Sequence, residues 1–470
     1  MWVGAGVALL AAQLVLLALS RRFAYEASLI HLPIPWLVAL GVTAGVVFLA
    51  LPWAARRVRS SRLLLVWIVA VGVLMRVAML SSTPVLEDDF NRYLWDGAVA
   101  SHGINPYANA PISAIEPDDG APPALVALAA ESGRIAERIN YPTLRSIYPP
   151  VAQAAFALAY RLEPWSLEAW RAVLMAFDLA TLGLLLALLR RLGRSPLWVA
   201  LYWWNPLVVK ELFNSAHMDA LVIPFVLGAL WLAMRGRNVW ASGVLALAAG
   251  VKLWPVLLLP IVLRPLLGHG AKLAAALAAF AVPLGLMAVP VLVAGLDATS
   301  GFVAFGGSWE ANDALFMALA WLAGALLDLV GVGSDAADGL SRMLVGLAVV
   351  GLALAFNRTV AEEPAELCRR SPIIVAALFL LGPTPFPWYY TWLVPLLVLA
   401  PVTSLLALTA LLPLYYLRFH LDARDQAAVF DHGVVWLEYL PVLALLAREW
   451  LVARRGGGAT PSTGALVDAR

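Results

Sequence analysis

Residues 63–80 read LLLVWIVAVGVLMRVAML, an apolar run that contains a single charged residue, Arg76. A helix needs about 20 predominantly apolar residues to cross the hydrocarbon core of a bilayer, and this run has the required character. Similar runs recur at 2–19, 36–54, 169–189, 218–233, 273–295 and 434–452. The pattern therefore predicts an all-α polytopic membrane protein.

The composition of the whole chain supports this prediction. Of its 470 residues, 62% are apolar and 13% are charged, and the formal net charge is +2. A soluble domain usually carries about 25% charged residues, so a soluble globule is excluded. The near-neutral charge, without a nucleic-acid motif, argues against nucleic acid as a partner. The single cysteine, Cys368, allows neither an intramolecular disulfide nor a cysteine-based metal site.

Arginines mark one side of the predicted bundle, because Lys and Arg in short loops are retained in the cytoplasm. They cluster at 56–62, 190–194, 235–237, 369–370 and 448–455. Placing these clusters inside puts residues 82–146, with nine acidic residues and four arginines, on the outer face. An acidic segment of this length is typical of an exported loop.

Three shorter apolar segments complete the predicted topology. Residues 147–162 are too few to span at 1.5 Å per residue, so we expect a juxtamembrane helix on the outer surface. Residues 239–250 and 253–264 are predicted to form a hairpin of half-helices with Lys252 at its outer vertex. The prediction is a single membrane domain over 1–455 with about 13 to 14 crossings, followed by a flexible cytosolic tail, 456–470.

The segment Leu86–Pro111, LEDDFNRYLWDGAVASHGINPYANAP, concentrates the reactive side chains of the outer loop. In a helix, Asp89 and Tyr93 share a face, and Arg92 lies one turn from both Asp89 and Asp88. Such a set could hold a general base, bind a divalent cation through carboxylates or clamp a sugar against aromatic rings. The alternative is a helix cap with solvated acids at a membrane boundary.

The pattern DD-x-x-RY-x-W-DG, followed by G-x-NPY-x-x-AP, resembles the first outer loop of bacterial GT-C glycosyltransferases that use polyprenyl-phosphate sugars, in particular mannosyltransferase-like members. The resemblance continues, in order, in IYPPVAQ (147–153), NSAHMDA (214–220), GVKLWP (250–255), WEAN (309–312), PWYYTW (387–392) and LEYLP (437–441). It implies a GT-C-type helical bundle with a long outer catalytic loop. The implied reaction is an inverting transfer of a sugar, above all mannose, from a polyprenyl phosphate to a lipid- or glycan-linked acceptor at the outer face of the bacterial cytoplasmic membrane.

The resemblance also implies roles for individual residues. Asp89, with a tyrosine four residues on, matches the family's catalytic aspartate, and Asp88 is the neighbour with which it could be confused. Lys252 resembles the family's phosphate-contacting lysine; alternatively, it snorkels to the interface. A divalent cation, Mg²⁺ or Mn²⁺, is compatible with this chemistry and not required by it, because the leaving group is a stabilised phosphate.

Further residues could bind the donor or stack on a sugar. The donor candidates are Arg76, Arg92, Tyr93, Tyr148, Asn214 and His217, and Lys210, Asn214 and His217 have the spacing of one helix face. The acceptor or stacking candidates are Trp95, Trp309, Glu310, Trp388 and Tyr389. Each of these roles has a structural alternative. Arg76 could belong to a structural ion pair, and His217 could simply lie at the membrane interface. An ordinary aromatic belt would explain Trp388 and Tyr389.

Two other kinds of function stay open at this point. A flippase for lipid-linked sugars, or a secondary transporter, would also show broken helices and intramembrane charges. A polymerase- or ligase-type transferase, or a non-catalytic assembly partner, is the second alternative. Against transport, no two-fold repeat is detectable, and the carboxylates gather in one outer loop. Asn91 and Ala98 depart from the family's pattern, so sugar or acceptor preference could differ.

Overall fold

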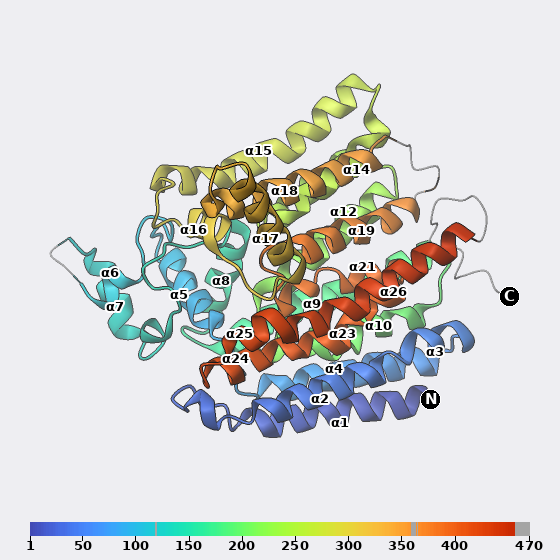
Figure 1. Cartoon of the computed structure of the whole chain (residues 1–470), viewed down its shortest axis with the longest axis horizontal. Helices are drawn as coiled ribbons and strands as arrows, with labels where there is room; N and C mark the ends of the chain where they lie inside the picture. The colour runs from blue at the N-terminus through green and yellow to red at the C-terminus, as the bar shows by residue number, and fades with distance from the viewer. Residues whose placement is uncertain (118–119, 359–362, 364, 456–470) are drawn as a thin grey trace.

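The computed structural model describes residues 1–117, 120–358, 363 and 365–455, and these residues form helices joined by short connections, without a β-strand among them (Figure 1). Eight of the helices within these ranges are long and apolar enough to cross a membrane, or nine if one bent pair is counted as a span. The all-α polytopic prediction is confirmed. The expected 13 to 14 crossings exceed this number, because several apolar stretches are broken into short helices. The predicted tail, 456–470, lies outside the described residues.

The N-terminal part forms a hairpin against the rest of the bundle. It consists of α1 (Trp2–Ser20), α2 (Ile34–Phe48), α3 (Leu51–Arg57) and α4 (Arg62–Leu80). The N-cap Ser61 accepts a hydrogen bond from the Leu64 backbone N–H (3.2 Å) and so fixes the start of α4. Helix α1 packs on α2 and α4, while α2 also contacts α23 (Leu408–Leu411) from the far end of the chain.

The segment predicted as an outer loop folds into short helices at one end of the bundle (Figure 1). These are α5 (Asp89–Ser101), α6 (Ile112–Ile115), α7 (Pro123–Glu131) and α8 (Pro150–Leu162). Helix α8 confirms the helix expected over 147–162. Gly97 lets α5 approach α8 closely, since a Cβ at this position would lie 2.4 Å from the Phe156 carbonyl oxygen.

The middle of the chain contains the broken helices. They follow α9 (Leu167–Arg191) as α10 (Ala200–Trp203), α11 (Pro206–Val209), α12 (Val222–Ala233), α13 (Asn238–Ala249) and α14 (Leu259–Leu263). The chain turns by 107° between Pro206–Asn214 and Met218–Ala233. Lys252 lies in the break between α13 and the short helical segment Trp254–Leu266. The predicted hairpin of half-helices is confirmed, because the Asn238 amide at the start of α13 donates to the Val262 carbonyl in α14 (2.6 Å).

The C-terminal half supplies the remaining walls of the bundle. Its helices are α15 (Gly270–Ala294), α16 (Gly301–Ser308), α17 (Ala314–Leu329), α18 (Ala337–Phe356), α19 (Ala365–Leu381), α20 (Pro387–Tyr390), α21 (Val394–Leu399), α22 (Thr403–Leu406), α24 (Leu417–Asp422), α25 (Ala427–Val429) and α26 (Val435–Arg455). The arginine-rich α3 and the C-terminal end of α26 lie at the opposite end of the molecule from α5 to α8 (Figure 1).

Candidate active site

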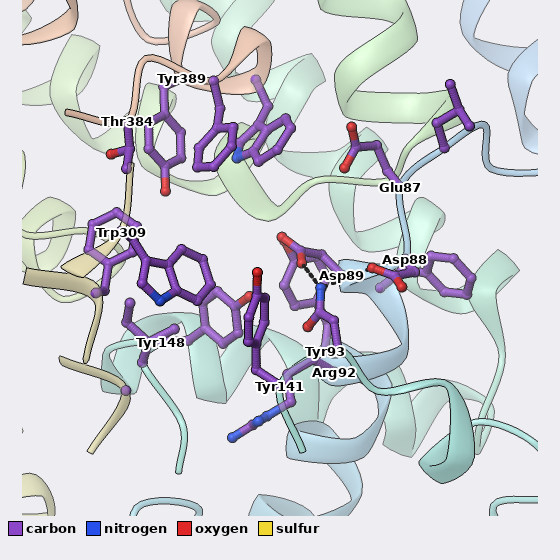
Figure 2. A pocket seen from close by; sticks show the side chains of 18 of the residues that line it. Glu87, Asp88, Asp89, Arg92, Tyr93, Tyr141, Tyr148, Trp309, Thr384 and Tyr389 are labelled. Carbon is purple, nitrogen blue, oxygen red and sulfur yellow. Dashed lines mark hydrogen bonds between the residues drawn. The ribbon is translucent and has the colours of Figure 1, made fainter. Parts of the chain in front are cut away.

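A cavity of about 1250 Å³ opens at the end of the bundle that carries α5 and α8. Its walls come from the α1–α2 connection, the segment 83–93, residues 138–149, the Lys252 hairpin, α16 and the start of α20. The acidic and aromatic side chains of these walls point toward one another across the cavity (Figure 2). Nine of the residues predicted from the sequence line it: Asp88, Asp89, Arg92, Tyr93, Tyr148, Lys252, Trp309, Trp388 and Tyr389.

Asp88 and Asp89 are bridged by one amide. The Asn140 Nδ2 donates to Asp88 Oδ1 (2.9 Å) and to Asp89 Oδ1 (2.7 Å), and the Tyr93 hydroxyl donates to Asp89 Oδ2 (3.3 Å). The predicted shared face of Asp89 and Tyr93 is thereby confirmed. Although Asp88 is the N-cap of α5, its side chain caps none of the described N–H groups of that helix. The two carboxylates are therefore held for a purpose other than capping.

Burial changes the titration of this pair. Desolvation, together with the charge of Asp89, raises the pKa of Asp88 to about 6. Burial also raises the pKa of Asp89, while hydrogen bonds from Asn140 and Tyr93 and the charge of Lys252 act in the opposite direction. A carboxylate whose pKa lies nearer to neutrality is a better general base than an exposed one.

Strained backbone surrounds the carboxylates. Three residues that are not glycine adopt left-handed conformations there: Leu86 (φ 60°), Tyr141 (φ 48°) and Ala216 (φ 57°). Leu86 lies two positions before Asp88, Tyr141 follows Asn140, and Ala216 precedes His217. Such conformations cost about 1 to 3 kcal/mol each, persist only where the surroundings enforce them, and cluster at functional sites.

His217 forms a layer behind the carboxylates. Its Nδ1 lies 3.8 Å from Asp89 Oδ2 and its Nε2 lies 3.9 Å from Glu87 Oε2. The imidazole is fully buried, stacks on the Trp388 ring (centroids 4.2 Å apart), and has no hydrogen-bond partner for either nitrogen among the described residues. His217 therefore lies next to Asp89 and Glu87 without a hydrogen bond to either carboxylate.

Lys252 supplies a cation to the same cavity. Its Nζ donates to Asp219 Oδ1 (2.7 Å) and lies 3.9 Å from the centre of the Tyr389 ring. The Trp392 indole also donates to Asp219 Oδ1 (2.6 Å), so the carboxylate is fixed from two sides. The ammonium group is thus oriented at the edge of an aromatic wall, where it can attract an anionic oxygen.

Comparisons with known proteins identify the family of the chain. The sequence model of the family described as "Alpha-(1->6)-mannopyranosyltransferase, N-terminal domain" matches residues 3–268. The chain belongs to this family. It is 25% identical over 442 residues to "Alpha-(1->6)-mannopyranosyltransferase A" of Mycobacterium tuberculosis, a match that covers 89% of this chain and 81% of the relative. No solved structure matches the chain. It is therefore a multi-pass membrane glycosyltransferase of a mannosyltransferase family.

Two arginines of this glycosyltransferase have partners other than those expected. Arg92 lines the cavity, but its guanidinium pairs with Asp96 (2.9 Å), one turn further along α5, and donates to the Leu144 carbonyl, rather than pairing with Asp88 or Asp89. Arg76 lies outside the cavity lining and forms a fully buried ion pair with Asp178. The structural alternative for Arg76 is therefore the one realised, because a charge within a span is costly and almost always pairs with another charge.

Four other candidate residues do not line the cavity. Trp95, on α5, packs on Trp165 in a small separate core and does not line the cavity, so its stacking role stays a prediction. Glu310 is half exposed and pairs with Arg342 (3.1 Å). The Asn214 amide bonds Ser82, Thr83 and Val85 and so shapes the segment that leads to the carboxylates. The fourth is His217. The chain bends by 107° between Pro206–Asn214 and Met218–Ala233, so Lys210, Asn214 and His217 do not share one helix face as predicted.

Sequence reasoning missed Asn140, the residue that joins the two carboxylates. It lies 51 positions from Asp89, in a stretch without a recognisable motif. The neighbouring Tyr141 was missed as well, although its ring packs against Trp309 (centroids 4.6 Å apart) across the cavity. The only available signal was the unusual length and acidity of the outer segment.

The acidic residues of the cavity are of the type that binds divalent cations. Among the described residues, no group of three or more His, Cys, Asp and Glu side chains is arranged to hold an ion. Asp88 and Asp89 already share the Asn140 amide. The described residues of the cavity therefore offer no preformed set of three such ligands, and a divalent cation stays a prediction.

Proposed function

We propose that the chain is an inverting mannosyltransferase that moves mannose from polyprenyl-phosphate mannose to a mannose hydroxyl of a glycolipid or glycan acceptor, at the outer face of a bacterial cytoplasmic membrane. The supporting observation is the placement of Asp89. Its carboxylate opens onto a cavity of about 1250 Å³ and is held by Asn140 and Tyr93, and Lys252 lines the same cavity. The mycobacterial relative is named as an α-(1→6)-mannopyranosyltransferase, and we propose the same linkage here.

In the proposed reaction, Asp89 accepts the proton of the acceptor hydroxyl while that oxygen attacks C1 of the donor mannose. The bond between C1 and the phosphate oxygen breaks, and the electron pair leaves with the polyprenyl phosphate. Attack from the face opposite the leaving group inverts the configuration at C1. Protonated Asp89 then releases its proton to solvent, and a single base is sufficient because the phosphate leaves without an acid.

Lys252 is proposed to bind the phosphate of the donor. Its ammonium group adds fixed positive charge where negative charge develops on the departing oxygens. Tyr389 and Trp388 extend this wall with aromatic rings suited to a sugar or an isoprenoid unit. An outer-face cavity has no access to cytosolic nucleotide sugars, which favours a lipid-linked donor. Mg²⁺ or Mn²⁺ as an additional phosphate ligand stays a prediction, tested by assaying transfer after chelation.

The test is transfer of radiolabelled mannose from synthetic polyprenyl-phosphate mannose by the purified protein in membrane-lipid extracts. Wild type is expected to make a labelled product that an α-(1→6)-specific mannosidase degrades, and Asp89→Asn is expected to make none. Lys252→Ala should raise the KM for the donor. A wild-type protein that transfers no label would contradict the proposal, and lipid-sugar translocation retained in Asp89→Asn would favour a transporter.

A further inference from the structure

The α1–α2 connection forms one wall of the cavity, although no step of the proposed reaction uses it. Residues of this connection that line the cavity include Arg21, Phe23, Tyr25, Glu26 and Leu29. The connection lies at the same end of the bundle as α5 to α8 (Figure 1). The two N-terminal helices thus bring polar and aromatic side chains to the acidic side of the site.

A carboxylate holds this wall in place. Glu26 Oε1 accepts hydrogen bonds from Arg134 Nη1 (2.6 Å) and from Arg138. The Arg138 guanidinium lies over the Tyr25 ring, 4.5 Å from its centre. Tyr25 keeps 54% of its surface exposed. The result is an open aromatic ring beside fixed charged groups, which is the combination of apolar face and hydrogen-bonding partners that a sugar ring requires.

The same wall is continuous with the catalytic carboxylates. Arg138, which contacts Tyr25, is two residues before Asn140, the amide that bridges Asp88 and Asp89. Burial, followed by the charge of Asp88, raises the pKa of Tyr25. Because Tyr25, Asp88 and Asp89 all line the cavity, a sugar chain lying on Tyr25 would share the cavity with Asp89.

Apolar and aromatic residues line the cavity around Trp309 and Tyr389. Phe305 packs on Trp309 (centroids 5.3 Å apart), and Trp254 stacks on Trp392 (5.4 Å), which stacks on Tyr389 (4.4 Å). We call this part of the cavity its apolar end. Figure 2 shows Trp309, Thr384 and Tyr389 on one side of Asp89, and Glu87 and Asp88 on the other. An isoprenoid tail would be stabilised by the apolar end, whereas a hydroxyl-rich chain would lose its hydrogen bonds to water there.

We propose that Tyr25, Glu26 and Arg138 form an acceptor subsite that holds the penultimate sugars of a mannoside while its terminal mannose reaches Asp89. This assignment rests on the proposed function. Tyr25 contacts the sugar ring, Arg138 binds its hydroxyl groups, and Glu26 is a positioning residue that orients Arg138. The subsite takes a mannoside from a glycolipid or from a polysaccharide, since both present the same sugars.

The experiment compares synthetic octyl α-mannosides of one and three sugars as acceptors, with synthetic polyprenyl-phosphate mannose as donor. In wild type, the trisaccharide should have the lower KM because it reaches the subsite. Tyr25→Ala should raise the trisaccharide KM about tenfold, equivalent to one lost contact, and leave the monosaccharide and donor KM unchanged. Tyr25→Phe retains the ring and should retain the low KM. Glu26→Gln should have a smaller effect in the same direction.

Trp36→Ala is the matched control, because this exposed aromatic residue belongs to the same N-terminal hairpin but lies outside the cavity lining. Its acceptor KM should equal that of wild type. Equal effects of Tyr25→Ala on both acceptors, an effect on the donor KM, or no effect at all would overturn the assignment.

Binding of the octyl trimannoside to the solubilised full chain, measured by titration calorimetry without donor, separates the two proposals. Weaker binding by Tyr25→Ala supports the subsite even if wild type transfers no mannose, an outcome that would overturn only the proposed function. Binding that Tyr25→Ala leaves unchanged would overturn the subsite even if wild type transfers mannose.

Discussion

Two groups of charged residues, one within a membrane span and one at the cavity, balance their charges differently. In the span α4, Arg76 pairs with Asp178, donates to the carbonyl oxygens of Gly72 (3.1 Å) and Trp203 (2.7 Å), and lies over the Trp203 ring. Asp178 in turn accepts a hydrogen bond from Tyr202. Both members of the ion pair are completely buried.

Asp88 and Asp89 form the second group, where two like charges lie side by side. They share a single amide, and both line an open cavity. Opposite charges that are buried together neutralise each other, whereas like charges held beside an open cavity have raised pKa values and are available for chemistry. Both members of the Arg76–Asp178 pair are completely buried, whereas the Asp89 side chain keeps 23% of its surface exposed. Charge balance and exposure to the cavity therefore separate the structural group from the functional one.

The largest effect is expected from Asp89→Asn. The amide keeps the shape of the carboxylate but cannot accept the proton, so the transfer rate should fall by about 10³-fold, within the usual range for a general base. The unfolding temperature in detergent should stay close to that of wild type. The comparison would break if Asp89→Asn lost its fold or kept its activity.

Arg76→Ala should give the converse result. Removing one partner of a buried ion pair leaves an uncompensated charge, and we expect the free energy of unfolding to fall by about 3 to 5 kcal/mol. The double variant Arg76→Met with Asp178→Leu should recover much of this loss. Denaturation in detergent measures the free energy of unfolding. The KM values of the folded fraction of Arg76→Ala should match those of wild type. A changed donor KM would instead return Arg76 to the phosphate site.

The pH dependence of transfer should report the acidic pair. A general base must be ionised, so activity rises with pH through the pKa of the pair, and the raised values, about 6 for Asp88, place this acid limb well above that of an ordinary carboxyl group. The hydrogen bonds from Asn140 lower both pKa values. Asn140→Ala should therefore move the limb to higher pH, as seen in rate–pH profiles. A limb that does not move would show that Asn140 is only structural.

The smallest effect is expected from Trp95→Phe. Trp95 packs in the separate core under α5, so the variant should lose about 1 kcal/mol of stability and keep the wild-type KM for both substrates. A raised acceptor KM would support the stacking role that its place in the motif suggests.

The local features of the fold were predictable from the sequence. Apolar runs predicted the long helices, and short apolar segments predicted α8 and the hairpin around Lys252, because length and hydropathy are properties of contiguous residues. The i,i+4 spacing correctly placed Tyr93 beside Asp89. The same spacing was wrong for Arg92, because Asp96 lies one turn ahead of it and competes for the same guanidinium.

The sequence by itself determined that the chain crosses a membrane and carries its reactive carboxylates in one long segment. Only the tertiary structure decided which charges are satisfied: Arg76 meets Asp178 across 102 positions, and Asn140 meets Asp89 across 51. The physical reason is that hydropathy acts locally along the helix, whereas the pairing of buried charges depends on which distant segments pack together.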